Sequence, residues 1–188
     1  MRGNHDDWFL RFLENDRRQL RHWFHDGGRE TIDSYCDLDI DDARRFILSR
    51  HPGHLDLLRR STFMVDDGAF LFVHAGIRPG VALKAQSPED LMWIREPFLN
   101  HYGKLPRVVV HGHSVMDPPR PVITENRISM DTGACWTGRL SVLVIDQQEL
   151  SFFQTHGDSQ SIVKIDPVEH DRGDGTLLDD LAWLAPQQ

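Results

Sequence analysis

The stretch Thr62-Phe63-Met64-Val65-Asp66-Asp67-Gly68-Ala69-Phe70-Leu71-Phe72-Val73-His74 decides the fold class, because the hydrophobic period changes there. Two apolar runs, at residues 62–66 and 69–73, flank Asp67-Gly68, and this combination is a strong signal for a β-hairpin. The second predicted strand ends at His74. We therefore expect helices before this stretch and strands after it.

Upstream of the hairpin, apolar residues recur at helical spacing among charged residues. Asp26-Gly27-Gly28 interrupts the pattern and predicts a loop. Pro52 suits the first turn of a helix. We expect helices at residues 7–25, 29–36, 41–50 and 52–60.

Downstream of the hairpin, Ser87-Pro88 reads as the start of a further helix, with Ser as the N-cap and Pro in the first turn. The runs that follow are short and apolar. We expect strands at residues 107–111, 122–124, 127–131, 139–146 and 149–155. Helices followed by strands predict an α/β fold, specifically a two-sheet α/β sandwich with flanking helices.

The domain organisation follows from where the chain becomes polar. We expect one domain over residues 1–156, and then a polar C-terminal tail over residues 157–188, in which residues 176–184 form a short helix. No internal repeat is visible.

Composition excludes several classes of function. The chain has 188 residues, 39% hydrophobic and 27% charged, and a net charge of −8. An acidic chain is poorly suited to bind the phosphates of a nucleic acid. The sequence also contains no long apolar span and no signal peptide, so it does not predict a membrane location. Cys36 and Cys135 make no disulfide framework. We expect a cytoplasmic protein, and its oligomeric state stays open.

Three short motifs carry residues suited to metal chemistry. Gly3-Asn4-His5-Asp6 places an amide oxygen, an imidazole and a carboxylate side by side, while His74 and His113 each follow a predicted strand. A single His at a strand end is more often structural, but three such motifs in one chain favour a shared site. Ligands of these types suit a divalent transition metal such as Mn, Fe or Zn.

These motifs resemble those of calcineurin-like metallophosphoesterases, and more narrowly the bacterial phosphoprotein phosphatases related to serine/threonine phosphatases. The matching segments, in chain order, are Gly3-Asn4-His5-Asp6, Trp23-Phe24-His25-Asp26-Gly27-Gly28, His74-Ala75-Gly76-Ile77, Asp90-Leu91-Met92-Trp93-Ile94-Arg95-Glu96, Gly112-His113-Ser114 and Asp131-Thr132-Gly133-Ala134. Many members of the superfamily have a second His two positions after His113. Val115 stands there instead, which favours the phosphoprotein phosphatase type.

The resemblance implies a two-sheet sandwich that holds two divalent metal ions, with manganese expected and iron or zinc as alternatives. It assigns Asn4, His74 and His113 as ligands of the second ion. His5 matches the proton donor to the leaving group, and Asp6 matches the carboxylate that orients it.

The resemblance also implies how the substrate is held. Arg95 is the better match for an arginine that binds the phosphoryl oxygens, and Arg78 is the second candidate. A planar guanidinium can bind two phosphate oxygens at once.

The sequence departs from the family pattern at its start. The family begins with Gly-Asp-x-His-Gly and then Gly-Asp-x-x-Asp-Arg-Gly, which supply the ligands of the first metal and the bridging Asp, and neither occurs in this position. We therefore expect a fragment of a longer phosphatase, or the product of a late start codon, with the N-terminal strands missing.

The expected function is metal-dependent phosphoric monoester hydrolysis of the serine/threonine protein phosphatase type, by a two-metal mechanism with a bridging water in the full-length form. The substrate would be a phosphorylated protein or a small phosphoester. Two alternatives stay open: a dinucleoside-polyphosphate hydrolase, and a catalytically inert fragment.

Overall fold

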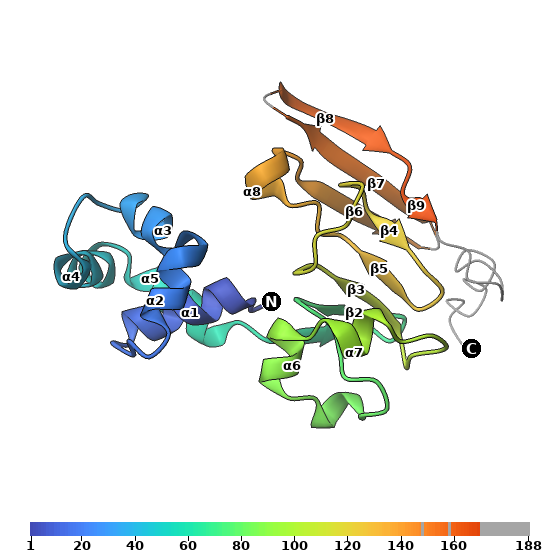
Figure 1. The fold of residues 1–188 in the computed structure, drawn as a ribbon, viewed down its shortest axis with the longest axis horizontal. Coiled ribbons are helices and arrows are strands. Elements are labelled where there is room, and N and C mark those ends of the chain that lie inside the picture. Colours follow the sequence, from blue (N-terminus) through green and yellow to red (C-terminus); the bar gives the residue numbers. More distant parts are fainter. Residues whose placement is uncertain (148, 158, 170–188) are drawn as a thin grey trace. The chain divides into compact units, whose positions relative to one another are not determined.

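The structure is a computed structural model that describes residues 1–147, 149–157 and 159–169 (Figure 1). The chain divides into two compact units, one formed by residues 1–63 and one that begins at Met64. No helix in the described part of the chain has both the length and the apolar character needed to cross a membrane.

The first unit is helical. Its core is built from buried aromatic and aliphatic side chains that face one another, among them Phe12, Leu13, Trp23, Ile32 and Ile47. Asp39 caps the fourth helix by accepting hydrogen bonds from the amides of Asp41 and Asp42. The elements are α1 (Asn4–Leu13), α2 (Leu20–Trp23), the kinked turn η1 (Phe24–Gly28), α3 (Arg29–Asp33), α4 (Ile40–Arg50) and α5 (Pro52–Arg60).

The prediction of one helix over residues 7–25 was wrong, because the chain breaks after Leu13. Asn15 adopts a left-handed backbone conformation with φ of 67°, which Asn tolerates better than most residues. The Asp16 carboxylate then accepts hydrogen bonds from the backbone and side chain of Arg18. The break expected at Asp26-Gly27-Gly28 is present within η1, because the backbone of Asp26 and Gly27 leaves helical geometry there, with φ of 94° at Gly27. Gly28 then lies against Trp23.

The second unit is built on a six-stranded sheet in the order β1-β2-β3-β5-β4-β9. The predicted hairpin is confirmed, since Met64 pairs with Val73 and Asp66 with Leu71. β2, β3 and β5 are parallel neighbours. The strands are β1 (Met64–Asp66), β2 (Phe70–Val73), β3 (Val108–His111), β4 (Val122–Ile123), β5 (Arg127–Ser129) and β9 (Val168–Glu169).

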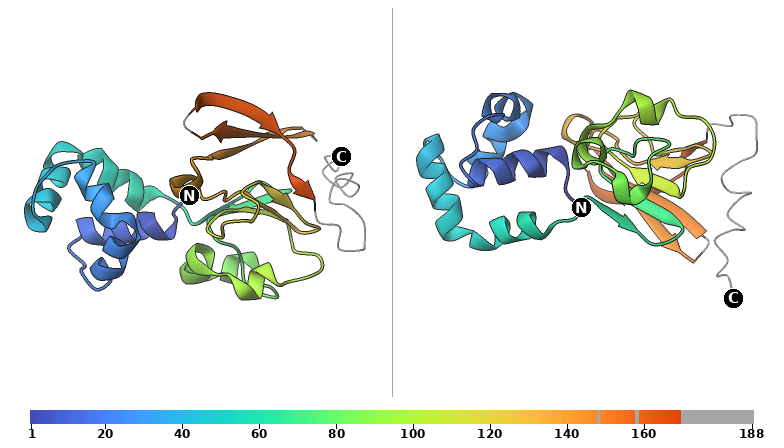
Figure 2. Two further views of the ribbon diagram at one scale, coloured as in Figure 1. Left: turned by 45° about the horizontal axis from the view of Figure 1, so that its top comes forward. Right: turned by 90° about the horizontal axis from the view of Figure 1, so that it is seen from below.

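A second sheet of three antiparallel strands, β6 (Ser141–Asp146), β7 (Glu149–His156) and β8 (Ser159–Ile165), packs on one face of the first. Phe70, Val108 and Ile128 of the first sheet meet Phe152 of the second in a common core. The helices α6 (Pro88–Trp93) and α7 (Glu96–Leu99) lie on the other face (Figure 2). The predicted fold class, an α/β sandwich with flanking helices, is confirmed.

Two expectations for the C-terminal part of the chain are not confirmed by the structure. A polar tail from residue 157 was wrong for the described part, because Ser159–Ile165 form β8 and pair with β7, and β9 joins the first sheet. The short helix predicted at residues 176–184 lies outside the described residues. Three short helical turns were not predicted: η2 (Leu83–Ala85), α7 and α8 (Ala134–Thr137).

Candidate metal and phosphate site

The candidate site lies at one edge of the six-stranded sheet, where three parallel strands end. His74 follows β2, His113 lies two residues beyond the end of β3, and Asp131 lies two residues beyond the end of β5. The backbone N–H of Gly112 donates a 2.8 Å hydrogen bond to the carbonyl of His74, and the N–H of Met130 donates a 2.7 Å hydrogen bond to the carbonyl of His111. Functional side chains commonly gather at the carboxyl ends of parallel strands.

The two predicted histidine ligands of this unit are neighbours. The ring centroids of His74 and His113 lie 5.2 Å apart, and Trp93 contacts His113 edge-on at 5.8 Å. His113 has a left-handed backbone with φ of 64°. A non-glycine residue in that region stores strain, and such strain is concentrated at functional sites.

His113 presents one nitrogen with an unfilled hydrogen-bonding role. Its Nε2 is buried and has no hydrogen-bond partner among the described residues, while its ring is hydrogen-bonded to the backbone of Trp93. The bond to Trp93 must therefore use Nδ1, which leaves Nε2 as an acceptor. Metal-binding histidines usually carry their second ring nitrogen on a carbonyl or carboxylate in this way.

Electrostatics keep this imidazole neutral. Burial, together with the charges of the nearby His74 and Arg95 and against an opposing effect of Asp131, lowers the pKa of His113 to about 4. A neutral imidazole is the form that binds a metal ion.

These residues fit part of a divalent metal site. Two imidazoles bound to one tetrahedral ion at about 2 Å place their ring centroids about 5 Å apart, close to the 5.2 Å between His74 and His113. Among the described residues no group of three or more His, Cys, Asp or Glu side chains is placed to hold a metal. The two histidines would therefore need an amide, water or substrate oxygen to complete the coordination.

The two predicted phosphate-binding arginines differ in their surroundings. Arg95 reaches the His113 carbonyl at 3.5 Å and is exposed, so its guanidinium stands beside the histidine pair. Arg78 instead makes a two-pronged ion pair with Asp90, at 2.9 Å and 2.5 Å. That pair raises the pKa of Arg78 and lowers that of Asp90. Arg95 is thus the freer of the two to bind an anion.

Asn4, His5 and Asp6 lie in the other unit, in the first turn of α1. Asn4 is buried, and His5 is exposed with its ring edge-on to Trp8 at 5.1 Å. The Asp6 carboxylate accepts a 2.8 Å hydrogen bond from the Gly3 amide and so caps the helix. Its predicted role in orienting His5 stays a prediction, as does the meeting of Asn4 with the two histidines of the second unit.

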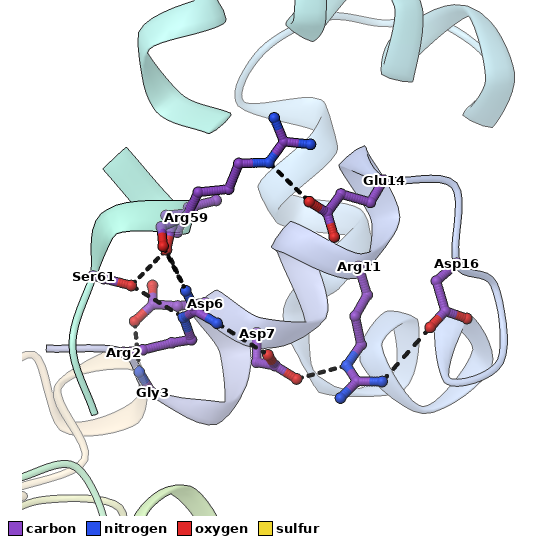
Figure 3. A network of polar contacts seen from close by, with 10 residues as sticks. Arg2, Gly3, Asp6, Asp7, Arg11, Glu14, Asp16, Arg59 and Ser61 are labelled. Carbon is purple, nitrogen blue, oxygen red and sulfur yellow. Dashed lines mark hydrogen bonds and ion pairs between the residues drawn. The ribbon is translucent and has the colours of Figure 1, made fainter. Parts of the chain in front are cut away.

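Arg2 holds this first turn in place (Figure 3). Its guanidinium donates hydrogen bonds to the carbonyls of Leu58 and Arg59 and to the Ser61 hydroxyl. It also lies over the Phe63 ring, at 4.9 Å from the centroid. The end of α5 and the start of α1 are therefore fixed to each other, and the motif that follows Arg2 has a defined backbone.

Two further residues near the histidine pair have separate roles. His111 is buried, with Nε2 bonded to the Ser129 hydroxyl at 2.8 Å and Nδ1 to the Gly112 carbonyl at 3.0 Å. Both nitrogens are used, so His111 is a structural residue. Asp131 was not assigned a role from the sequence. Its Oδ1 accepts a hydrogen bond from the Gly133 amide, and its charge acts on His113.

Comparison with known proteins gave little beyond this geometry. No protein-family model matches the sequence, and no curated protein matches it at a significant level. One solved structure, of a "putative diadenosine tetraphosphatase", is similar at 16% identity with a TM-score of 0.43. The match covers 88% of this chain and 66% of that chain, so this chain spans less than two thirds of that protein.

Proposed function

We propose that this chain is part of a metal-dependent phosphoric monoester hydrolase of the protein-phosphatase type, with manganese as the preferred ion. The observation that supports it most is the unpaired Nε2 of His113 beside His74, at the carboxyl edge of parallel strands and next to Arg95. When bound, a divalent ion would polarise a phosphoryl oxygen and acidify water.

The residues of the chain would divide the remaining work. Arg95 would hold the phosphoryl oxygens through its planar fork. His5 would give a proton to the departing alkoxide, which lowers the barrier to its release. Asn4 would add a third ligand to the two histidines. The ligands of the first ion, which the family resemblance also implies, would come from the N-terminal motifs that this sequence lacks.

The test measures manganese-stimulated hydrolysis of p-nitrophenyl phosphate by this chain and by a form extended upstream of Met1. We expect the extended form to be active and the shorter chain to be nearly inert. In the extended form, His113→Ala and His5→Asn should each lower the rate by about 10²–10⁴, while the exposed His156→Ala should leave it unchanged. An extended form without metal-stimulated activity would refute the proposal.

A second candidate, hydrolysis of a dinucleoside polyphosphate, is supported by Trp136. This side chain is 80% exposed on the turn α8, and it flanks Gly133 together with the 43% exposed Val115, two residues after His113. An exposed indole beside a phosphate site suits stacking on a nucleobase. If so, Trp136→Ala should raise KM for a dinucleoside tetraphosphate about tenfold but leave KM for a phosphoserine peptide unchanged.

A further inference from the structure

A second pair of neighbouring histidines lies in the helical unit, in a groove of about 940 Å³. Its walls come from α1, α3, α5 and the turn η1, and they include Tyr35, His51 and His54 together with the carboxylates of Asp6 and Glu30. His51 precedes the first turn of α5 and His54 lies three residues on. The fold therefore brings two imidazoles, a phenol and two carboxylates to one cavity.

The two imidazoles are spaced as two ligands of one ion would be. The ring centroids of His51 and His54 are 5.1 Å apart, against about 5 Å for two imidazoles on one tetrahedral ion. The separation nearly equals the 5.2 Å between His74 and His113. His54 is exposed and His51 half-buried, so an ion from solution can reach both rings.

Tyr35 supplies the support that a ligand histidine needs. Its hydroxyl oxygen lies 2.7 Å from Nδ1 of His54, and its ring contacts that of His51 edge-on at 5.2 Å. The phenol oxygen can accept a hydrogen bond from Nδ1–H of His54 at this distance, which leaves Nε2 of His54 as the nitrogen that binds a metal. Such outer partners fix the tautomer and orientation of a ligand histidine.

We propose that His51 and His54 bind a divalent transition-metal ion, such as Zn²⁺, Ni²⁺ or Co²⁺, in this groove. Since the described residues hold no converged group of three or more His, Cys, Asp or Glu side chains, water ligands complete the coordination of the ion. Imidazole suits these ions better than it suits Mg²⁺ or Ca²⁺. The proposal does not depend on the phosphatase function.

The experiment is a Co²⁺ titration of the full chain carrying His74→Ala, which disables the other histidine pair. Calorimetry gives the affinity, and paramagnetic broadening of backbone amide signals gives the location of the ion. We expect one binding event, with the amides around Tyr35 and His54 broadened first. Absence of binding in this chain, or broadening centred elsewhere, would overturn the proposal.

Three further variants, each added to that chain, separate a metal site from a stacked aromatic cluster. His54→Gln keeps a polar group opposite Tyr35 and should abolish the binding event. Tyr35→Phe keeps the ring contacts but removes the hydroxyl, and should weaken the affinity about tenfold. The matched control His22→Ala removes an exposed histidine outside the groove and should change nothing. Equal affinity with and without His54 would rule out the site.

Discussion

The Gly112 amide bonds to the His74 carbonyl at 2.8 Å, and this one contact fixes the backbone next to His113 to the end of the neighbouring strand. The space around Gly112 and Gly76, which both lie near this contact, predicts how much an added methyl group destabilises each position. A Cβ on Gly112 would meet nothing closer than 3.7 Å, whereas on Gly76 it would lie 2.3 Å from the Phe98 ring. We expect Gly76→Ala to cost about 1–3 kcal/mol in urea unfolding and Gly112→Ala to cost much less. Equal costs would show that the Phe98 ring yields freely.

The buried His111 should make the free energy of unfolding depend on pH. Burial lowers its pKa to about 4 from 6.5, so between these values the unfolded chain binds a proton that the folded chain does not. Stability should therefore fall as the pH drops from 6.5 to 4, by roughly 3 kcal/mol from this residue. With chelator present, His111→Gln should flatten that part of the curve of unfolding free energy against pH. An unchanged curve would show that His111 titrates normally.

The hydrogen bonds of Arg2 between the start of α1 and the end of α5 should contribute measurably to the stability of the helical unit. Arg2→Lys keeps the charge but cannot reach Leu58, Arg59 and Ser61 at once, so unfolding of the helical unit should become easier by about 1–3 kcal/mol. Arg18→Lys, whose ion pair with Asp16 is exposed at the surface, is the control and should have no measurable effect. Circular dichroism during urea unfolding measures both, and similar behaviour of the two variants would contradict the role given to Arg2.

The two candidate phosphate-binding arginines can be separated by binding alone. In the presence of Mn²⁺, Arg95→Ala should weaken binding of inorganic phosphate about tenfold, because a charge-assisted hydrogen bond is lost. Arg78→Ala should lower stability through the loss of its pair with Asp90 and leave phosphate affinity nearly unchanged. Calorimetric titration with phosphate measures the affinities. The reverse ranking would make Arg78 the anion-binding residue.

Local sequence patterns predicted much of the fold. The Asp67-Gly68 hairpin, the Ser87 cap of α6 and the apolar strand that ends at His111 each depend on residues adjacent in sequence, and all three are present. The break after Leu13 was missed because helical periodicity continues on both sides of it. β8 was missed because its sequence is half polar, and it becomes a strand only by pairing with β7.

The sequence predicted those residues of the candidate site that directly follow a buried strand. His74 and His113 were expected to meet because each follows a buried strand, and parallel pairing of β2 with β3 does bring them together. The position of Asp131 after β5 gave the same signal and was not used. The groove around His51 and His54 could not be anticipated, because the approach of Tyr35 depends on tertiary packing between α3 and α5.

The central claim is that His74 and His113 bind one divalent ion. The direct measurement follows the imidazole ¹⁵N chemical shifts of the chain by NMR during titration with Zn²⁺. We predict that Nε2 of His113 shifts together with one ring nitrogen of His74, with the same apparent affinity, while both nitrogens of His111 stay unchanged. If His113 keeps its metal-free shifts at saturating Zn²⁺, or shifts without His74, the two histidines do not form a metal site.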